Sequence, residues 1–352
     1  MKEENKKEMP TKQAKEKKKF PVWPKAVSIV LILVVGTYFL ASCKPGKSAK
    51  SMEKVNLGIS KSFLSIPVYI AKKQGFFSKE GLDVTVKEYS SGKLATKGLF
   101  AGEVEMATVA DMPVVFNSFR RQDFCIFATF TYSYPFIKII TRKDKGIKTG
   151  ADLKGKRVGA NRGTSSHFYL GVYLIHNNLS ISDVEMVHAK TVDLPVALKN
   201  NEVDAISVWQ PYSQEAERLM QDNAIILPQP EIYRTNFNFA AMKSFAKDHP
   251  EILIKFLRAI NKAAMFIKDN KEKSQEIIAE SFKLDKDIVL SAWNDFVFDI
   301  SLDQSLLVVW DEIARWAIKN KFAHSRKLPN YLNFIYMDAL DAVKPESITI
   351  IR

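Results

Sequence analysis

An internal repeat is the feature of this sequence that most constrains its fold. Residues 99–109 (LFAGEVEMATV) align without gaps on residues 198–208 (LKNNEVDAISV), and a proline follows each copy shortly afterwards, at Pro113 and Pro211. Around both copies, short stretches of β-forming residues alternate with stretches of helical pattern. An alternating order of strand and helix is typical of a mainly parallel sheet flanked by helices. The repeat therefore predicts two copies of one α/β lobe.

The two halves predict matching sets of elements, and residues 248–352 have a helical pattern. Residues 82–86 alternate apolar and polar side chains with the period of two that is typical of a half-buried strand. Two α/β lobes side by side leave a cleft between the carboxyl ends of their strands, which is where open α/β sheets bind ligands. The expected strands are residues 55–59, 82–86, 106–109, 157–160, 184–189 and 205–208, and the expected helices are residues 67–74, 94–101, 168–176 and 194–200.

The N-terminal segment has the order of a secretory signal. A Lys-rich stretch, residues 1–25, precedes an uncharged run, residues 26–42, which ends in small residues before Cys43. The tetrapeptide Leu-Ala-Ser-Cys that ends at Cys43 resembles the bacterial lipobox, in which the cysteine becomes lipid-modified after cleavage. We therefore predict a signal segment at 1–42, lipidation of Cys43 and a polar tether at 43–53.

An uncleaved membrane anchor is the alternative interpretation of the same segment. The uncharged run is 17 residues long, and a membrane-spanning helix needs roughly 17–25 residues. Both interpretations place the folded part outside the cytoplasm and attach it to a membrane.

Composition and motifs argue against several other classes. The formal net charge is +13, but the lysines are scattered among acids, with no dense basic patch and no nucleic-acid-binding module, so no nucleic acid is expected as a partner. The 2 cysteines make neither a disulfide scaffold nor a zinc site. Ser166 and His167 are adjacent and cannot face one another on a helix, and the sequence has no nucleophile elbow and no phosphate-binding loop. We therefore expect no enzyme activity, no cofactor and no metal.

A series of short motifs follows in a fixed order between residues 55 and 257. The motifs are residues 67–77 (PVYIAKKQGFF), 80–84 (EGLDV), 91–92 (SG), 101–107 (AGEVEMA), 153–159 (LKGKRVG), 163–165 (GTS), 203–205 (VDA) and 209–212 (WQPY). Together they resemble the solute-binding proteins of ABC importers for sulfonates, taurine, nitrate and thiamine precursors.

The resemblance implies the two-lobed type 2 periplasmic-binding-protein fold, with the ligand cleft between the lobes. In this fold the chain crosses between the lobes twice, and residues 136–140 and 237–240 are the candidate crossings. Lobe 1 is then expected at residues 54–140, together with the C-terminal helical part at 238–352, and lobe 2 at residues 141–237. The resemblance further implies a monomeric receptor that captures a small anionic solute, sulfonate-like or taurine-like, by lobe closure and delivers it to an ABC permease.

The candidate binding residues follow strands and precede helices. Gly163, Thr164, Ser165 and Ser166 stand at a helix N-terminus, where unpaired N–H groups and the helix dipole favour an anion. Ser91 and Gly92 have the same arrangement in the first half, and in both places the hydroxyls have the alternative role of capping their own helix. The resemblance adds further ligand loops. The full set is Ser62, Phe63, Ser91, Gly92, Asp111, Gly163, Thr164, Ser165, Ser166, Trp209 and Asn238.

Some alternatives remain open from the sequence. Asp111 has the alternative role of a helix cap, and Trp209 that of a core residue. A neutral heterocycle, such as a thiamine-precursor pyrimidine, is the alternative solute, and the aromatic stretch at 127–136 would then serve as its stacking wall. The function has two alternatives on the same fold, namely an enzyme of cofactor biosynthesis or a sensory or adhesion module without a permease.

Overall fold

The structure of the protein is a computed structural model that describes residue 19, residues 52–323 and residues 325–351. Apart from residue 19, the predicted signal segment lies outside the described residues, as do Cys43 and residues 44–51 of the predicted tether. No helix within the described residues combines the length and the apolar character that crossing a membrane requires.

Five strands form the first sheet, in the spatial order β2-β1-β3-β10-β4. β1 pairs in parallel with β2 and β3, whereas β10 pairs antiparallel with β3 on one side and with β4 on the other. The other strands of the sheet therefore share one direction, and β10 runs against them, as expected for a mainly parallel sheet. The strands are β1 (Glu53–Ser60), β2 (Leu82–Tyr89), β3 (Met106–Ala110), β4 (Phe124–Ser133) and β10 (Thr235–Met242).

The second sheet repeats this arrangement, in the spatial order β7-β6-β8-β5-β9. β6 pairs in parallel with β7 and β8, and β5 pairs antiparallel with β8 and β9. The strand that runs against the others occupies the same place in both sheets, next to one edge, as the internal repeat predicts for two copies of one lobe. The strands are β5 (Ile137–Arg142), β6 (Arg157–Ala160), β7 (Glu185–His188), β8 (Ala205–Trp209) and β9 (Ala224–Ile226).

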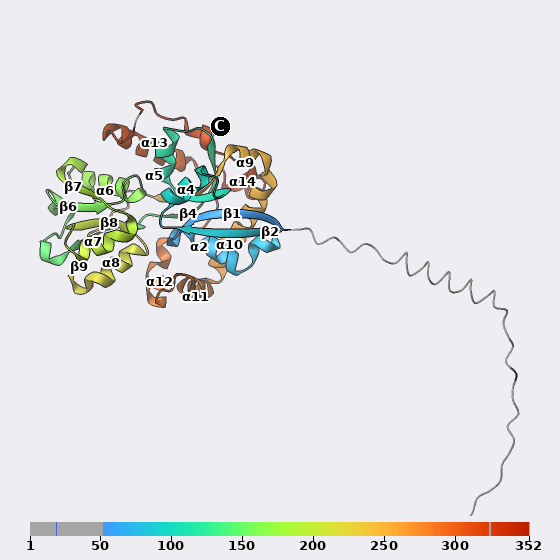
Figure 1. Ribbon diagram of the computed structural model, residues 1–352, viewed down its shortest axis with the longest axis horizontal. Helices are drawn as coiled ribbons and strands as arrows, with labels where there is room; N and C mark the ends of the chain where they lie inside the picture. The colour runs from blue at the N-terminus through green and yellow to red at the C-terminus, as the bar shows by residue number, and fades with distance from the viewer. Residues whose placement is uncertain (1–18, 20–51, 324, 352) are drawn as a thin grey trace, which may run out of the picture. The chain divides into compact units, whose positions relative to one another are not determined.

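Helices cover both sheets, and the C-terminal ones gather around the first sheet (Figure 1). α10 packs on α2 and α3, α11 packs on α2, and α13 packs on α5. We call the first sheet with these helices the first lobe, and the second sheet with α6, α7 and α8 the second lobe. The helices are α2 (Ile66–Lys73), α3 (Phe76–Lys79), α4 (Gly92–Phe100), α5 (Asp111–Ser118), α6 (Ser165–His176), α7 (Leu194–Lys199), α8 (Tyr212–Met220), α9 (Lys243–Asp248), α10 (Pro250–Asp269), α11 (Lys271–Phe282), α12 (Lys286–Ala292), α13 (Gln304–Lys319) and α14 (Asp338–Asp341).

The chain passes between the two sheets twice, and the two passages lie side by side. It leaves the first sheet after Ser133 and returns to it at Thr235, and these two residues are paired in register. On the other side of the passages, the N–H of Leu227 donates to the carbonyl of Ile139 at 2.9 Å. The expected crossing segments, 136–140 and 237–240, overlap β5 and β10, so each passage lies just before the segment that the sequence indicated.

Aromatic side chains fill the core of the first lobe. The aromatic stretch at 127–136 contributes to this core and also to a contact with the second lobe. Phe127 and Phe130 are fully buried, and the ring of Phe130 stacks on Phe239 with 3.8 Å between centroids. Phe136 instead stacks on Trp209 at 6.2 Å, in the second lobe. Phe127 also stacks on Phe239, with 5.7 Å between centroids. Because Phe127 and Phe130 pack on Phe239 whereas Phe136 packs on Trp209, the stretch does not form one stacking wall.

The equivalent acids of the internal repeat, Glu105 and Asp204, join neighbouring parallel strands in the two sheets. A carboxylate oxygen of Asp204 accepts the main-chain N–H of Arg157 at 3.0 Å, and one of Glu105 accepts that of Asn56 at 2.7 Å. The N–H of each acid donates in return to the carbonyl of the same partner, at 2.8 Å for Asp204 and 3.1 Å for Glu105. The repeat thus places an acid where it closes a pair of strands in each lobe.

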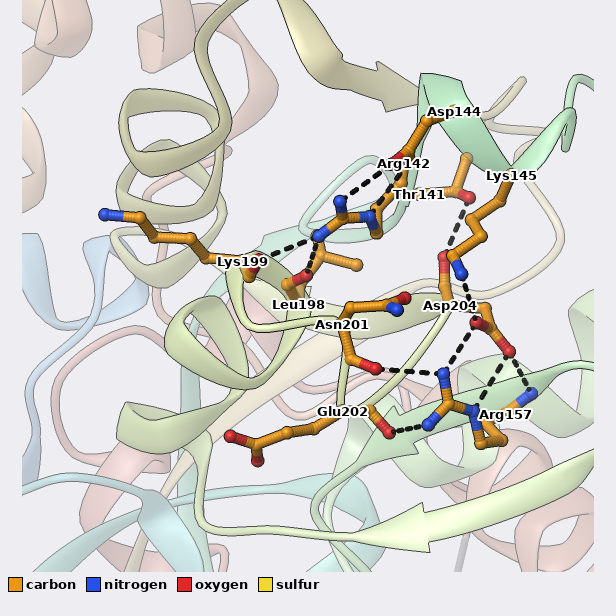
Figure 2. A network of polar contacts seen from close by, with 10 residues as sticks. All are labelled: Thr141, Arg142, Asp144, Lys145, Arg157, Leu198, Lys199, Asn201, Glu202 and Asp204. Atoms are coloured by element: carbon orange, nitrogen blue, oxygen red, sulfur yellow. Dashed lines mark hydrogen bonds and ion pairs between the residues drawn. The ribbon is translucent and has the colours of Figure 1, made fainter.

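Asp204 also holds a wider polar network (Figure 2). Its carboxylate lies 2.9 Å from Nη2 of Arg157 and 3.7 Å from Nζ of Lys145, while the Arg157 guanidinium also donates to the carbonyls of Asn201 and Glu202 at 3.0 and 2.7 Å. Burial raises the pKa of Asp204, but the hydrogen bonds and the charge of Arg157 outweigh burial, so the pKa lies below its ordinary value.

We expect Asp204→Asn to lower the free energy of unfolding by about 1–2 kcal/mol at neutral pH, because the contact with Arg157 loses its charge. A carboxyl with a depressed folded-state pKa stabilises the fold above its unfolded pKa of about 3.9, and this contribution is lost as the pH falls through the folded value. Urea denaturation of variant and wild type should therefore give a difference that is full at neutral pH and smaller below about pH 4.

Glu105→Gln is the matched control for Asp204→Asn, because it alters a strand-closing acid without touching an arginine contact. We expect it to cost less than Asp204→Asn. The same difference between Asp204→Asn and wild type at neutral and at strongly acidic pH would contradict the role assigned to the Asp204 charge.

Candidate functional site

A small pocket, here called the cleft pocket, lies between the two lobes at the carboxyl ends of their strands. In this structure its volume is about 20 Å³. Six of the predicted binding residues line it: Ser62, Ser91, Gly92, Thr164, Ser165 and Trp209. The other lining residues are not among the predicted binding residues, although Phe136 ends the aromatic stretch that was expected as a wall; they are Ser60, Leu64, Lys93, Ala110, Pro113, Phe136 and Phe237.

The first lobe presents the N-terminus of α4 to the cleft pocket. Ser91 is the N-cap residue, and its Oγ accepts the N–H of Leu94 at 3.4 Å, so the capping alternative holds for this hydroxyl. A Cβ on Gly92 would lie 3.3 Å from the carbonyl oxygen of Thr108 in β3. Glycine at this position therefore allows the start of the helix to lie directly against β3, where its unpaired N–H groups reach the pocket.

The second lobe presents the N-terminus of α6. Gly163 has a φ of 78°, a left-handed conformation that favours glycine. Thr164 is the N-cap residue, but its Oγ1 donates back to the carbonyl of Asn161 at 2.7 Å and does not cap the first turn. The first N–H groups of α6 thus keep their capacity to bind an anion, and the capping alternative does not apply to Thr164.

Two buried polar groups of the cleft pocket have no partner in the protein. Oγ of Ser62 and Nε1 of Trp209 are both buried without a hydrogen bond. An unsatisfied buried donor costs roughly 1–3 kcal/mol, so such groups mark places where a bound molecule supplies the missing acceptor. Trp209 therefore offers an unpaired indole N–H in addition to its packing.

Charge in the cleft pocket is of one sign. Lys93 is the charged residue that lines it, and its Nζ donates across the cleft to the carbonyl of Arg162 at 2.8 Å. Desolvation lowers the pKa of Lys93 from its ordinary value. No Asp, Glu, His or Cys lines the pocket, and the described residues contain no cluster of these types that could hold a metal ion. The arrangement can bind an anion.

Asp111 lies behind the pocket wall, where it organises several elements. It is fully buried and accepts the N–H of Asn236 at 2.8 Å, Nε1 of Trp310 at 2.9 Å and the hydroxyl of Tyr233 at 3.0 Å. The same hydroxyl lies 3.3 Å from Oγ of Ser165. Burial raises the pKa of Asp111 to about 6, against the effect of these donors. Tyr233 thus links Asp111 to Ser165, at the start of α6, through its hydroxyl.

The structure does not bring the remaining predicted residues to the cleft pocket. Phe63 is buried and packs on Phe282 at 5.3 Å between ring centroids. Ser166 is buried and shares a hydrogen bond with Thr164 at 3.0 Å. The side-chain amide of Asn238 lies inside the first sheet, where its oxygen accepts from the hydroxyl of Thr129 and its nitrogen donates to the carbonyl of Val109.

Gly163 also lies outside the cleft pocket. It lines a neighbouring hollow, within reach of Lys93.

We expect Tyr233→Phe to lower the free energy of unfolding by about 1–3 kcal/mol, because the buried carboxylate of Asp111 loses a donor. The donor favours the charged carboxylate, and the pKa of Asp111 is about 6. The loss should therefore be larger at pH 8, where Asp111 is charged, than at pH 5, where it is protonated. Urea denaturation at both pH values measures it. Tyr134→Phe, which alters an exposed tyrosine, is the control, and an equal loss at the two pH values would refute the assignment.

Comparison with known proteins supports the fold. The family described as NMT1/THI5-like matches residues 62–274, more than half of the chain. A Bacillus subtilis protein named "Putative aliphatic sulfonates-binding protein" is 28% identical over 270 residues, which cover 74% of this chain and 80% of that protein. The crystal structure of the periplasmic aliphatic sulphonate binding protein from Escherichia coli matches with a TM-score of 0.71 at 21% identity, covering 82% of this chain and 93% of that one. This match confirms the predicted type 2 periplasmic-binding-protein fold.

The relatives also include an enzyme. The 4-amino-5-hydroxymethyl-2-methylpyrimidine phosphate synthase of Schizosaccharomyces pombe is 24% identical over 229 residues, which cover 60% of this chain and 65% of that protein. Binding and catalysis therefore both occur among similar chains, and the residues of the cleft pocket must decide between them.

Proposed function

The chain belongs to the NMT1/THI5-like family, and we propose that it is a solute receptor that binds an aliphatic sulfonate in the cleft pocket and delivers it to the permease of an ABC importer. The names of the Bacillus subtilis and Escherichia coli relatives support this choice of solute. The rest of the argument comes from the chemistry of the pocket.

The observation that carries the proposal is the set of donors that face the pocket without a protein acceptor. These donors are the first N–H groups of α4 and α6, Oγ of Ser62 and Nε1 of Trp209. A sulfonate presents three equivalent acceptor oxygens and one negative charge that it keeps across the physiological pH range. It can therefore satisfy donors from both lobes together, with the helix dipoles and Lys93 adding favourable charge.

The walls of the pocket favour a sulfonate with an apolar body. Leu64, Phe136 and Phe237 line the pocket beside the indole of Trp209. The ammonium of taurine would find no carboxylate there, because no Asp or Glu lines the pocket. An amine left without a counter-charge in an apolar site is costly, so we propose an alkanesulfonate as the solute in preference to taurine.

Two contacts join the lobes across the cleft and suit capture by lobe closure. Nζ of Lys93 donates to the carbonyl of Arg162 at 2.8 Å, and the hydroxyl of Tyr212 donates to the carbonyl of Ser90 at 3.4 Å. Because the two chain passages lie side by side, they form a natural hinge between the lobes. The moving bodies are proposed as the first lobe, up to Ser133 and from Thr235 onward, and the second lobe from β5 to β9; the boundaries expected at 140 and 237 shift by a few residues so that β5 and β10 stay whole.

The proposed receptor works outside the cytoplasm. The sequence of the N-terminal segment supports this location, and lipidation of Cys43 would keep the receptor near its permease. The receptor acts as a monomer in this proposal.

A catalytic alternative finds no support in the cleft pocket. A hydroxyl acts as a nucleophile when a neighbouring base activates it, and no Asp, Glu, His or Cys lines the pocket beside its serines and Thr164. The amine of Lys93 is held by the carbonyl of Arg162. His167 lies nearby but does not line the pocket, and burial lowers its pKa to about 3. We therefore favour binding over catalysis.

Propane-1-sulfonate should bind the full-length protein in detergent, and at 100 times its dissociation constant it should stabilise the fold by about 2.7 kcal/mol in a thermal-shift measurement. Ser62→Ala should weaken this binding about tenfold, because one donor to the sulfonate is lost. The same change should leave the stability of the unliganded protein unaltered, since Oγ of Ser62 has no partner there.

Ser78→Ala, an exposed serine of α3, is the matched control and should leave the affinity unchanged. Equal affinities for Ser62→Ala and Ser78→Ala would remove the cleft pocket from the proposal. A folded protein that binds no sulfonate would refute the proposed solute.

Taurine and propane-1-sulfonate test the role of the missing counter-charge. We expect taurine to bind at least about tenfold more weakly, because its ammonium must be desolvated without a carboxylate partner. Isothermal titration calorimetry of both ligands gives the ratio, and tighter binding of taurine would contradict the apolar placement of the solute body.

A further inference from the structure

A second and larger hollow, here called the cationic pocket, adjoins the cleft pocket. Its volume is about 420 Å³, against about 20 Å³ for the cleft pocket. Lys93 and Pro113 line both. A solute seated in the cleft pocket therefore has the cationic pocket as its neighbouring space, with Lys93 at the boundary.

The cationic pocket gathers four positive side chains from both lobes. Lys93 and Lys97 come from α4, Arg120 follows α5, and Arg162 precedes α6 in the second lobe. No Asp or Glu lines the pocket. Lys93 and Lys97 are four residues apart on one helix, a spacing at which like charges repel. The cluster therefore favours occupation by negative charge.

Three members of this cluster, Lys93, Lys97 and Arg162, form no ion pair with the described residues. The ammonium of Lys93 is held by a neutral acceptor, the carbonyl of Arg162, at 2.8 Å. Its positive charge is thus positioned at the boundary of the two pockets and remains available to an anion.

The other side chains of the cationic pocket are largely apolar. Leu94, Phe116 and Phe322 line it together with Phe100, whose ring lies 3.9 Å below the guanidinium of Arg121. A pocket that combines cationic and apolar side chains matches a solute that carries its charge on a hydrocarbon body. It matches a strongly hydrated inorganic ion less well, because such an ion gains nothing from apolar walls.

The hollow on the other side of Ser90 has a different composition. It is lined by Lys61 and Arg218, but also by Glu88, Glu215 and Asp285. Its charges are mixed, so it offers no net attraction to an anion. The preference for negative charge is therefore specific to the side of the cleft on which Lys97 and Arg162 lie.

We propose that the cationic pocket is a subsite for a second anionic group, so that the protein selects organic dianions with an acidic group at each end of a short apolar chain. One sulfonate occupies the cleft pocket, the chain passes Lys93, and the second acidic group lies among Lys97, Arg120 and Arg162. The inference rests on the proposed function, because the first sulfonate must bind where that function places it.

The experiment compares alkane-1-sulfonates with α,ω-alkanedisulfonates of two to five carbons by isothermal titration calorimetry of the full-length protein in detergent. In the wild type, at least one disulfonate should bind about tenfold or more tightly than the monosulfonate of the same chain length. The gain should shrink at high salt, because the cationic pocket is open to solvent and its charges are screened.

Lys97→Glu is the test variant, since Lys97 lines the cationic pocket but not the cleft pocket. It should remove the disulfonate gain while the affinity for the monosulfonate stays within about threefold. Lys61→Glu makes the same charge reversal at the mixed-charge hollow and should preserve the gain.

The outcomes separate the two proposals. If the monosulfonate binds and no disulfonate gains affinity, or if the gain survives Lys97→Glu, the second subsite is refuted and the proposed function stands. If Lys61→Glu abolishes the gain as Lys97→Glu does, overall charge explains the gain and the subsite is refuted. If neither class of ligand binds, the proposed function fails and this inference fails with it.

Discussion

The buried carboxylate of Asp111 is the contact on which the geometry of the cleft depends. It stands at the start of α5 and is held by Asn236 of β10 and by Trp310 of α13. Through the hydroxyl of Tyr233 it also reaches Ser165, at the start of α6 in the other lobe. A buried carboxylate needs several donors to remain stable, so it holds β10 and α13 of the first lobe together. Tyr233 lies in the passage by which the chain returns to the first sheet, which places this network beside the connections between the lobes.

The electrostatics of the cleft follow from what the two lobes place at their facing edges. Each lobe contributes a helix N-terminus, and the charged residues at the cleft pocket and beside it, in the cationic pocket, are positive. The acids of the second lobe, by contrast, are used at the sheet, as Asp204 shows by its contacts with Arg157. No Asp or Glu lines the cleft pocket or the cationic pocket, so neither helix N-terminus there has a carboxylate beside it.

The sequence predicted the strands, the helices and the two-lobed fold well because these depend on local patterns. The repeat at 99–109 and 198–208 appears as the segments that enter β3 and β8, with Glu105 and Asp204 in equivalent contacts. The candidate site was predicted in part. Helix N-termini with Gly and Ser are visible as motifs, and Ser91, Gly92, Thr164 and Ser165 of these motifs line the pocket, whereas Gly163 and Ser166 do not. Asp111 follows a strand and Asn238 lies within one, but their partners lie more than a hundred residues away in sequence, at Asn236 and at Thr129.

The sequence by itself determined that the chain alternates strands and helices twice, with a glycine- and serine-containing turn ahead of a helix in each half. Periodicity and turn chemistry act over a few residues, so the sequence expresses them directly. Only the tertiary structure decided which polar groups at the cleft lack a partner in the protein. Ser62 and Trp209 keep unpaired groups there, whereas the carboxylate of Asp111 and the amide of Asn238 are bound by distant residues. It also decided that Lys93, Lys97, Arg120 and Arg162 share one hollow, because that depends on how two lobes close on each other and not on any local pattern.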